Sequence, residues 1–251
     1  MNNDKLLKGL KILVTAGPTP VKVDDVRILT NIFTGTTGYK IAVLAAEKGA
    51  DVMLLLGPHH IENSDMLANE SYSEIMKKMM EIVTSKARIN SSAGRFKIER
   101  YAYFEQLAAL AEKHIASRSF DTVIHSAAVA DYAPAAKKGK IKSNLDKLHI
   151  DLDPTPKIIK KFKVWDPKIF QVQFKLEVGL NEASLIETAY QSLLKNNSDL
   201  VIANNLTGTS TATAAAYIID KARKIEKIAT REMMYEILLK KVRKRSGEIN
   251  E

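Results

Sequence analysis

The fold is decided by the apolar run Leu10-Lys11-Ile12-Leu13-Val14-Thr15, which ends in the turn Ala16-Gly17-Pro18-Thr19-Pro20. A short apolar run that meets a Gly and Pro turn is typical of a buried β-strand. Gly35-Thr36-Thr37-Gly38 then precedes apolar residues at helical spacing, which stop at Gly49. Strand character resumes over Asp51–Leu56. Strand, turn, helix and strand form a βαβ unit, so this stretch predicts a parallel sheet with a right-handed crossover.

The alternation of helix and strand continues along the chain. Hydrophobic spacing predicts these later elements: a helix at 105–117, strands at 121–126 and 170–176, a helix at 183–196, strands at 199–203 and 215–219, and a closing helix at 230–244. The strand at 215–219 is predicted to be the last strand. The closing helix is expected to turn Met233, Ile237, Leu238 and Val242 inward. Such alternation favours an α/β fold with a doubly wound, mostly parallel, Rossmann-like sheet, whose ligands bind beyond the carboxyl ends of the strands.

Two segments depart from this scheme. Residues 58–95 are polar and rich in Met, and we expect a lid-like insertion there. Residues 133–160 carry Lys and Pro with weak strand signals, and we expect a protruding flap there. Because 251 residues fit one large α/β domain, the prediction is a single nucleotide-binding domain over residues 1–251.

Composition excludes several classes of protein. The chain has no cysteine, which excludes disulfides, thiolate metal sites and a cysteine nucleophile. It has no leader-like apolar segment and no run near the roughly 18 apolar residues of a membrane helix, so we expect a cytoplasmic protein with no membrane partner. The net charge of +9 is spread along the chain without interleaved aromatic residues, which favours a polyanionic small molecule over nucleic acid.

The glycines behind the first predicted strand indicate a phosphate site. Gly35 and Gly38 stand ahead of a helix, where unpaired backbone N–H groups and the helix dipole favour an anion. The turn at Gly17 would open onto the same end of the sheet. The alternative is that these glycines only shape turns and cap the helix. The dinucleotide fingerprint G-x-G-x-x-G and the P-loop pattern are both absent, and the binding of a mononucleotide remains possible.

At this point the residues resemble a known family. The blocks that carry the resemblance are Thr15-Ala16-Gly17-Pro18-Thr19, residues 24–38 (DDVRILTNIFTGTTG), Ala127-Ala128-Val129-Ala130-Asp131-Tyr132, Lys140-Ile141-Lys142, Phe174-Lys175-Leu176-Glu177 and residues 199–205 (DLVIANN). They resemble, in the family's order, the signatures of phosphopantothenoylcysteine synthetase, the phosphopantothenate–cysteine ligase of coenzyme A synthesis. The resemblance spans roughly residues 10–245 and matches the stand-alone form, without a fused flavin-dependent decarboxylase.

The resemblance implies a two-step ligase reaction. The carboxylate of 4′-phosphopantothenate attacks the α-phosphorus of a nucleoside triphosphate, which gives an acyl-nucleotide and pyrophosphate. The amine of L-cysteine then displaces the nucleotide. The family uses CTP or ATP, with CTP slightly favoured here, together with Mg²⁺, and works as a homodimer. The chemistry needs a clamp on the triphosphate and no protein nucleophile.

The resemblance assigns the two catalytic positions to Asn31 and Lys140. Asn31 would contact the acyl group and the acyl-nucleotide through its side-chain amide, which combines donor and acceptor. The alternative for Asn31 is an Asx-turn residue. Lys140 would approach the nucleotide phosphates as a compact charge, and its alternative is a solvated surface lysine.

The resemblance also assigns the substrate-binding residues. Arg27 would reach phosphopantothenate from the neighbouring subunit, unless it forms a surface ion pair with Asp24 or Asp25. Ala127, Ala128 and Asp131 would lie on the strand-end turn that holds substrate and nucleotide. Asp131 could instead cap a helix.

The nucleotide would be bound by Gly17, Thr34, Gly35, Gly38, Asp131, Lys140, Phe174 and Asn204. Phe174 could instead be a core residue. Family members usually have Ser-Ser where this chain has Phe33-Thr34, so a hydroxyl contact to phosphate is lost at Phe33 and kept at Thr34. The metal ligands stay unassigned, and the five histidines show no metal-binding spacing.

Two other functions stay open at this stage. A short-chain dehydrogenase-like NAD(P) oxidoreductase would begin with a similar βαβ unit, but it is disfavoured by the missing fingerprint and because Tyr132 and Lys137 are one residue too far apart for Tyr-x-x-x-Lys. A non-catalytic nucleotide-binding or nucleic-acid-binding module is suggested by Phe33 and the basic charge.

Overall fold

The structure is a computed structural model, which describes residues 5–58, 95–144, 146–206 and 216–248. Within these residues, eight strands form one sheet in the order β12-β11-β10-β9-β6-β1-β4-β5. In this order, their bounds are Ile225–Ile228, Ala216–Asp220, Leu200–Leu206, Phe170–Val178, Thr122–His125, Lys11–Ala16, Asp51–Leu56 and Phe96–Arg100. The neighbours from β5 to β10 are parallel, and β11 is antiparallel to β10 and β12. The predicted mostly parallel sheet is therefore confirmed.

The strand order reverses at the centre of the sheet. From β1 the chain proceeds outward through β4 to β5, and from β6 it proceeds outward through β9 to β10 on the other side. The carboxyl ends of β1 and β6 therefore flank a topological switch point, which is where doubly wound sheets bind their ligands. The predicted glycine turns lie at this edge.

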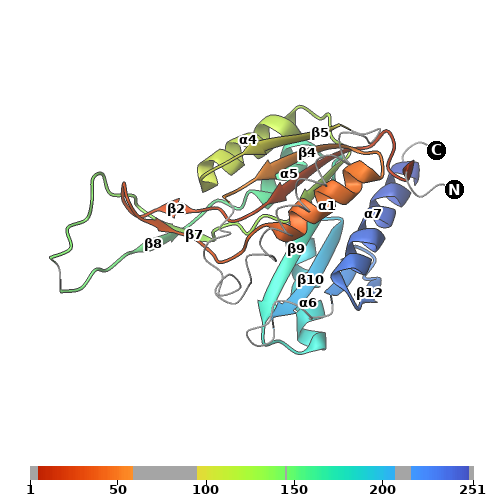
Figure 1. The fold of residues 1–251 in the computed structure, drawn as a ribbon. Coiled ribbons are helices and arrows are strands. Elements are labelled where there is room, and N and C mark those ends of the chain that lie inside the picture. The colour runs from red at the N-terminus through yellow and green to blue at the C-terminus, as the bar shows by residue number, and fades with distance from the viewer. Residues whose placement is uncertain (1–4, 59–94, 145, 207–215, 249–251) are drawn as a thin grey trace, which may run out of the picture.

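Helices cover both faces of the sheet (Figure 1). The first face is covered by α1 (Thr36–Glu47) and α7 (Arg231–Glu248), and the second by α4 (Phe104–Ala116), α5 (Ile159–Trp165) and α6 (Glu182–Lys195). Successive residues of β1 serve opposite faces, since Ile12 and Val14 pack in the α1 layer and Leu13 in the α4 layer. These side chains are fully buried, which explains why the first strand reads as a continuous apolar run.

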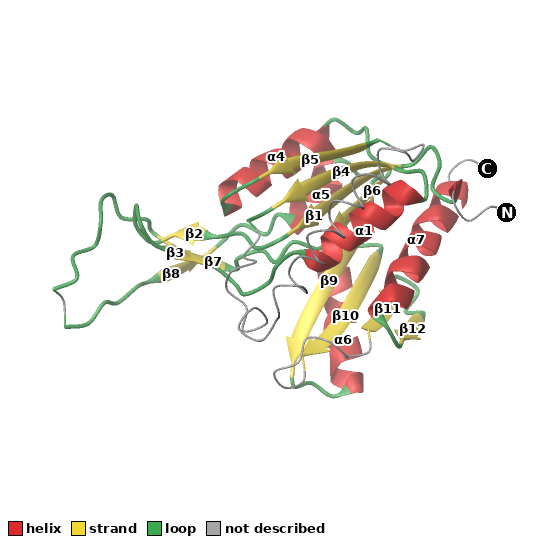
Figure 2. Cartoon of the chain, viewed as in Figure 1, coloured by secondary structure: helices red, strands yellow, loops and turns green. Residues whose placement is uncertain are grey.

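Two small hairpins form an arm that projects from the sheet (Figure 2). In the arm, β2 (Val21–Lys22) pairs with β3 (Ile28–Leu29), and β7 (Tyr132–Pro134) pairs with β8 (Leu152–Pro154). We call residues 21–29, 132–144 and 146–154 the arm. The predicted flap at 133–160 is found here, but it ends earlier than expected, because α5 begins at Ile159 and buries Phe162 completely.

Two predictions about the remaining elements were wrong, and a third falls almost entirely outside the described residues. The strand predicted last, at 215–219, is followed by β12, so that prediction was wrong; β12 has a weak apolar signal because Ile228 is its one buried residue. The inward position of Met233 was also wrong, since Met233 is 48% exposed while Met234 is buried. The lid-like insertion at 58–95 lies outside the described residues, apart from its two ends.

No helix in the described ranges combines the length and the apolar character that crossing a membrane requires.

Candidate functional site

Three glycines from two segments meet where β1 ends and α1 begins. Gly17 follows β1 with a φ of 93°, and Gly35 precedes α1 with a φ of 80°, both in the left-handed region that favours glycine. A Cβ atom on Gly35 would lie 2.6 Å from the backbone nitrogen of Gly17, and one on Gly38 would lie 2.7 Å from the Cβ of Ala16. Neither position admits a side chain. The structure thus brings together the predicted Gly17, Gly35 and Gly38, which we call the glycine junction.

A fourth glycine, Gly57, completes this packing, although the sequence analysis gave it no role. Its backbone N–H donates to the carbonyl oxygen of Ala16 across 2.8 Å. A Cβ atom on Gly57 would lie 2.5 Å from the carbonyl oxygen of Pro18 and 2.8 Å from Tyr101. The Tyr101 hydroxyl donates to the carbonyl oxygens of Ala16 and Gly17, at 2.9 and 3.1 Å, and its burial raises its pKa. The Gly-Pro pair behind a buried strand was the signal for this position.

The amino end of α1 is suited to an anion. Gly35 is the N-cap and offers no side chain to the first N–H groups, and the first turn holds no acidic residue. Such N–H groups and the positive end of the helix dipole attract negative charge. The hydroxyl oxygens of Thr34 and Thr36 lie 2.8 Å apart on the same turn. A phosphate could therefore receive both backbone and hydroxyl hydrogen bonds here.

Asn31 lies beside the turn that follows β6. Its side-chain Nδ2 donates to the carbonyl oxygen of Ala128 across 2.8 Å, and its Oδ1 accepts the backbone N–H of Phe33 at 3.1 Å. The second contact is the Asx turn that the sequence analysis gave as the alternative for Asn31. The two contacts fix the plane of the amide and use one of its two N–H bonds. The other N–H has no partner among the described residues.

Two buried threonines hold the turn that carries Ala127 and Ala128. Thr15 Oγ1 accepts the N–H of Ala127 at 3.2 Å, and Thr19 Oγ1 accepts the N–H of Ala130 at 2.7 Å. The N–H of Ala128 donates to the carbonyl oxygen of Gly17 across 3.0 Å. The turn after β6 is thereby joined to the turn after β1. Sequence reasoning missed Thr15 and Thr19, because their partners lie about a hundred residues away.

His125 supports the same threonine from β6. Its Nδ1 lies 2.8 Å from Thr15 Oγ1, and its ring packs edge-on against Phe162. Since Thr15 Oγ1 accepts from the Ala127 N–H, its own hydroxyl hydrogen can point to Nδ1, which places the imidazole proton on Nε2. Burial lowers the pKa of His125 to about 4, so the ring is neutral at physiological pH.

Asp131 follows on the same turn and is well exposed. Its carboxylate forms an ion pair with Lys157. Its carbonyl oxygen accepts the N–H of Thr155 at 2.9 Å, which ties the turn to the chain after β8. Asp131 precedes β7 and not a helix, so the alternative of a helix cap was wrong.

Arg27 and Lys140 lie on the arm. Arg27 forms the ion pair with Asp24 that the sequence analysis gave as its alternative role, and its guanidinium also donates to the carbonyl oxygen of Ile141 at 3.3 Å. Lys140 precedes Ile141 and is exposed. A hollow of about 350 Å³ is lined by residues 140–144. The two predicted basic residues are therefore neighbours on one projecting element.

Phe174 and Asn204 lie on adjacent strands, on the face that α1 covers. In the register of β9 and β10, Phe174 pairs with Ile202 and Asn204 with Leu176. Phe174 packs partly buried against the core of this face, as its alternative role requires. Asn204 is half-buried, and its Oδ1 lies below the surface without a hydrogen-bond partner in the described part of the chain. An unpaired buried amide oxygen is available to a ligand.

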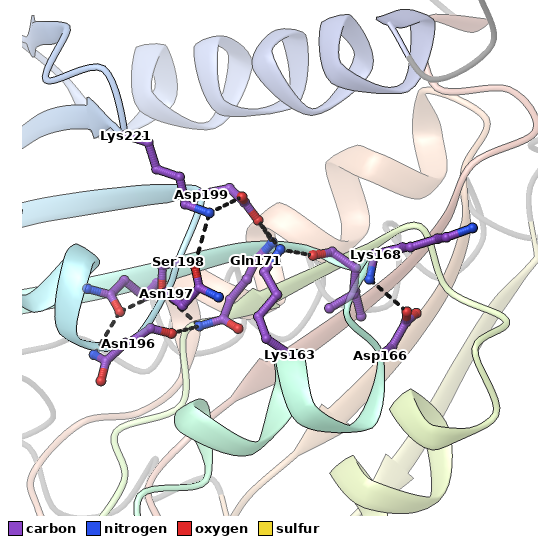
Figure 3. Close-up of polar contacts among 11 residues, drawn as sticks. Lys163, Asp166, Lys168, Gln171, Asn196, Asn197, Ser198, Asp199 and Lys221 are labelled. Carbon is purple, nitrogen blue, oxygen red and sulfur yellow. Dashed lines mark hydrogen bonds and ion pairs between the residues drawn. The ribbon is translucent and has the colours of Figure 1, made fainter.

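A separate polar cluster lies at the opposite edge of the sheet, around Asp199 (Figure 3). Asp199 precedes β10, and its carboxylate contacts Lys163 at 2.7 Å and Lys221 at 2.9 Å. It also accepts the backbone N–H of Gln171 across 2.8 Å. Burial acts to raise the pKa of Asp199, but these hydrogen bonds and the lysine charge outweigh it and lower the pKa. Because the carboxylate is fully paired, we assign this cluster to fold stability.

The family assignment comes from comparison with known proteins. The sequence matches the family described as the DNA/pantothenate metabolism flavoprotein C-terminal domain over residues 7–94 and 97–244. The chain belongs to this family. The match to the DNA/pantothenate metabolism flavoprotein C-terminal domain includes the glycine junction, the arm and the turn after β6. The resemblance found in the sequence is thereby confirmed at the level of the family.

Curated relatives with this domain include CoaBC proteins. The coenzyme A biosynthesis bifunctional protein CoaBC of Thermococcus kodakarensis is 31% identical over 232 residues, which cover 91% of this chain and 50% of the relative. The CoaBC protein of Escherichia coli is 27% identical over 257 residues, covering 97% of this chain and 54% of the relative. The chain thus spans about half the length of these relatives.

Solved structures share the fold. The DNA/pantothenate metabolism flavoprotein from Streptococcus pneumoniae has a TM-score of 0.73 and 27% identity, covering 94% of this chain and 100% of that chain. A mutant of Cab2 in complex with phosphopantothenate-cysteine has a TM-score of 0.74 at 18% identity, covering 96% of this chain and 89% of that chain. The second likeness concerns the fold alone.

Proposed function

We propose that the chain is a ligase of coenzyme A biosynthesis that joins 4′-phosphopantothenate to L-cysteine. In the first step, the substrate carboxylate attacks the α-phosphorus of CTP or ATP, and pyrophosphate leaves. In the second step, the cysteine amine attacks the acyl carbon, the nucleoside monophosphate leaves, and an amide forms. The proposal is supported by the family match and by relatives whose names place them in coenzyme A biosynthesis.

The observation that carries the proposal is the contact of Asn31 with Ala128 beside the glycine junction. It puts a fixed amide next to the helix end at which a triphosphate would be held. In the proposed reaction, the unpaired N–H of Asn31 donates to the acyl oxygen as charge develops on it. Thr34, Gly35 and Gly38 hold phosphate oxygens, and Ala127, Ala128 and Asp131 line the substrate side. Phe174 and Asn204 extend the nucleotide site along the face of α1.

The proposed reaction does not require a thiol or a carboxylate of the protein to act as a nucleophile. The chain has no cysteine, and neither step requires a protein nucleophile. The proposal includes Mg²⁺, which would bind together with the nucleoside triphosphate. Within the described residues, no three His, Asp or Glu side chains gather as metal ligands. In sites of this kind Mg²⁺ is usually held by substrate phosphates together with one or two carboxylates.

We also propose that the ligase is a homodimer whose interface includes the arm. Large apolar side chains on or beside the arm are exposed: Val26 by 63%, Ile28 by 46%, Leu29 by 44% and Ile32 by 82%. A cluster of this kind on a projecting element is the usual mark of a protein contact. A second copy would cover it and would place Arg27 near the phosphopantothenate of the neighbouring subunit.

The single domain over residues 1–251 and the cytoplasmic location stay predictions.

A pyrophosphate assay tests the proposal. The purified chain is supplied with 4′-phosphopantothenate, L-cysteine, Mg²⁺ and one of four nucleoside triphosphates. We expect pyrophosphate release with CTP or ATP that depends on phosphopantothenate, and a single burst when cysteine is omitted. A chain that binds nucleotide but releases no pyrophosphate would be the non-catalytic module. Binding of NADPH in place of CTP and ATP would favour the oxidoreductase.

A further inference from the structure

Lys140 lies between two residues whose backbone groups are all held by residues 24–27. On one side, the N–H of Gly139 donates to Asp25 Oδ2 at 2.7 Å, and its carbonyl oxygen accepts the N–H of Asp25 at 3.2 Å. On the other side, the N–H of Ile141 donates to Asp24 Oδ2 at 3.0 Å, and its carbonyl oxygen accepts from Arg27. The backbone at Lys140 is therefore anchored on both sides.

Asp24 is the centre of this arrangement. It is 2% exposed, and each of its carboxylate oxygens accepts two hydrogen bonds. Oδ1 accepts the N–H groups of Val26 and Arg27 at 2.8 and 2.7 Å, and Oδ2 accepts from the Arg27 guanidinium and from Ile141. Burial alone would raise the pKa of Asp24, but these bonds hold it at about 2. The carboxylate is thus ionised and its hydrogen-bonding capacity is filled.

The side chain of Lys140, in contrast, is exposed and has no ion-pair partner among the described residues. A lysine ammonium sits at the end of a flexible four-carbon stem, so the position of the backbone limits which atoms it can reach. Lys140 is also one of the five residues that line the hollow at 140–144. Asp24, through the N–H of Ile141, provides one of the contacts that hold the backbone beside Lys140.

We propose that Asp24 is a positioning residue for the ligase reaction, which acts by holding the backbone beside Lys140. The inference rests on the proposed function, because it assumes that Lys140 meets the nucleotide phosphates. The same carboxylate oxygen accepts from the guanidinium of Arg27 and from the N–H of Ile141, so Asp24 holds both Arg27 and the backbone beside Lys140. A displacement of the arm then changes the contacts of both residues together.

A double-mutant cycle between Asp24 and Lys140 tests this proposal. The four proteins are the wild type, Asp24→Asn, Lys140→Gln and the double variant, and the rate is the single-turnover release of pyrophosphate at saturating nucleotide. We expect Asp24→Asn to slow the wild type about tenfold to a hundredfold. With 4′-phosphopantothenate also saturating, so that binding through Arg27 does not limit the rate, it should slow the Lys140→Gln protein less than about threefold, since Lys140 is no longer there to be positioned. The KM for cysteine should stay unchanged.

Asp199→Asn is the matched control. It removes a paired carboxylate at the opposite edge of the sheet, so it should change the rate by the same factor in the wild type and in the Lys140→Gln background. Gly139→Ala is a second test variant if Asp24→Asn does not fold. Gly139 has a φ of 76° and no atom within 4 Å of an added Cβ, so the change disturbs the backbone beside Lys140 without a clash.

The outcomes separate the two proposals. If the wild type is active and the double variant is slowed by the product of the two single-variant factors, the positioning role is overturned and the ligase function stands. A wild type that releases no pyrophosphate with any of the four nucleoside triphosphates would overturn the ligase function, and the positioning role with it. A Gly139→Ala effect that persists in the Lys140→Gln background would also overturn the positioning role.

Discussion

The side-chain amide of Asn31 donates a hydrogen bond across 2.8 Å to the carbonyl oxygen of Ala128, a residue 97 positions further along the chain. The contact joins the segment before α1 to the turn after β6, at the point where the strand order reverses. Doubly wound sheets bind ligands at such points. The fixed amide and the glycine junction beside it form the centre of the proposed site.

Replacing Asn31 by Ala should separate nucleotide binding from product formation. Since the donor to the developing acyl charge is lost while the glycine junction is kept, we expect a nucleotide Kd within about threefold of wild type and an amide-forming rate lower by about a hundredfold or more. Calorimetry and product quantification measure the two effects. Asn196→Ala removes a comparable amide at the remote edge and should leave the rate unchanged. Full activity in Asn31→Ala would refute the role of Asn31.

Replacing Lys140 by Gln should slow acyl-nucleotide formation. The ammonium is proposed to stabilise charge on the phosphates, so its loss should reduce the pyrophosphate burst rate about tenfold to a hundredfold. Lys138→Gln makes the same charge change two residues away on the arm and should have little effect. An unchanged burst in Lys140→Gln would argue against contact with the phosphates.

Replacing Gly35 by Ala should abolish nucleotide binding and lower stability. An added Cβ would lie 2.6 Å from the backbone of Gly17, so the junction must open. Gly9→Ala is the control, because Gly9 also has a positive φ, of 87°, but has open space around the added atom. That control should lose only about 1 kcal/mol and keep its affinity for nucleotide. Equal nucleotide affinity in both variants would contradict the assigned site.

Acidification should weaken the fold through His125. The unfolded chain takes up a proton near pH 6.5, whereas the buried ring takes it up near pH 4. The unfolded state therefore binds more protons between these values, and stability is lost as the pH falls from 6.5 to 4. A difference of about 2.5 pKa units corresponds to about 3 kcal/mol. Urea unfolding at several pH values should show that the free energy of unfolding falls with this slope in the wild type and with a flatter slope in His125→Gln. The control His149→Gln, at an exposed position, should keep the wild-type slope.

Mixing two inactive variants tests the proposed dimer. If Arg27 serves the site of the neighbouring subunit, a dimer of one Arg27→Ala and one Asn31→Ala subunit contains one intact site. When the two proteins are mixed and allowed to exchange subunits, half of the dimers are mixed and each mixed dimer has one intact site out of two. About a quarter of the wild-type rate should therefore return. If Arg27 serves its own subunit, no mixed dimer has an intact site and no activity returns.

Local sequence patterns predicted the strands at the centre of the sheet and the glycines beside them. Leu13 and Ile12 lie in a run that is buried on both faces, and Gly35 occupies a backbone conformation that other residues avoid. Such constraints act within a few residues and can be recognised without tertiary information. The inward face of α7 was misjudged by a single position, because one residue in a helix corresponds to a rotation of about 100°.

The supporting contacts of the site could not be predicted in this way. Thr15, Thr19 and Asp24 act through backbone groups more than a hundred residues distant, and no local pattern distinguishes them from ordinary turn or strand residues. The helix α5 was missed because it spans seven residues and has one fully packed side chain, Phe162. These features depend on which segments the fold brings together.

The most direct test of the central claim is a crystal structure with 4′-phosphopantothenate and a non-hydrolysable CTP or ATP analogue. We expect phosphate oxygens about 2.7–3.2 Å from backbone N–H groups at the start of α1, with the Asn31 amide facing the substrate carboxylate. Phosphates bound elsewhere, with no ligand at the glycine junction and the amide of Asn31 engaged only with Ala128 and Phe33, would contradict it.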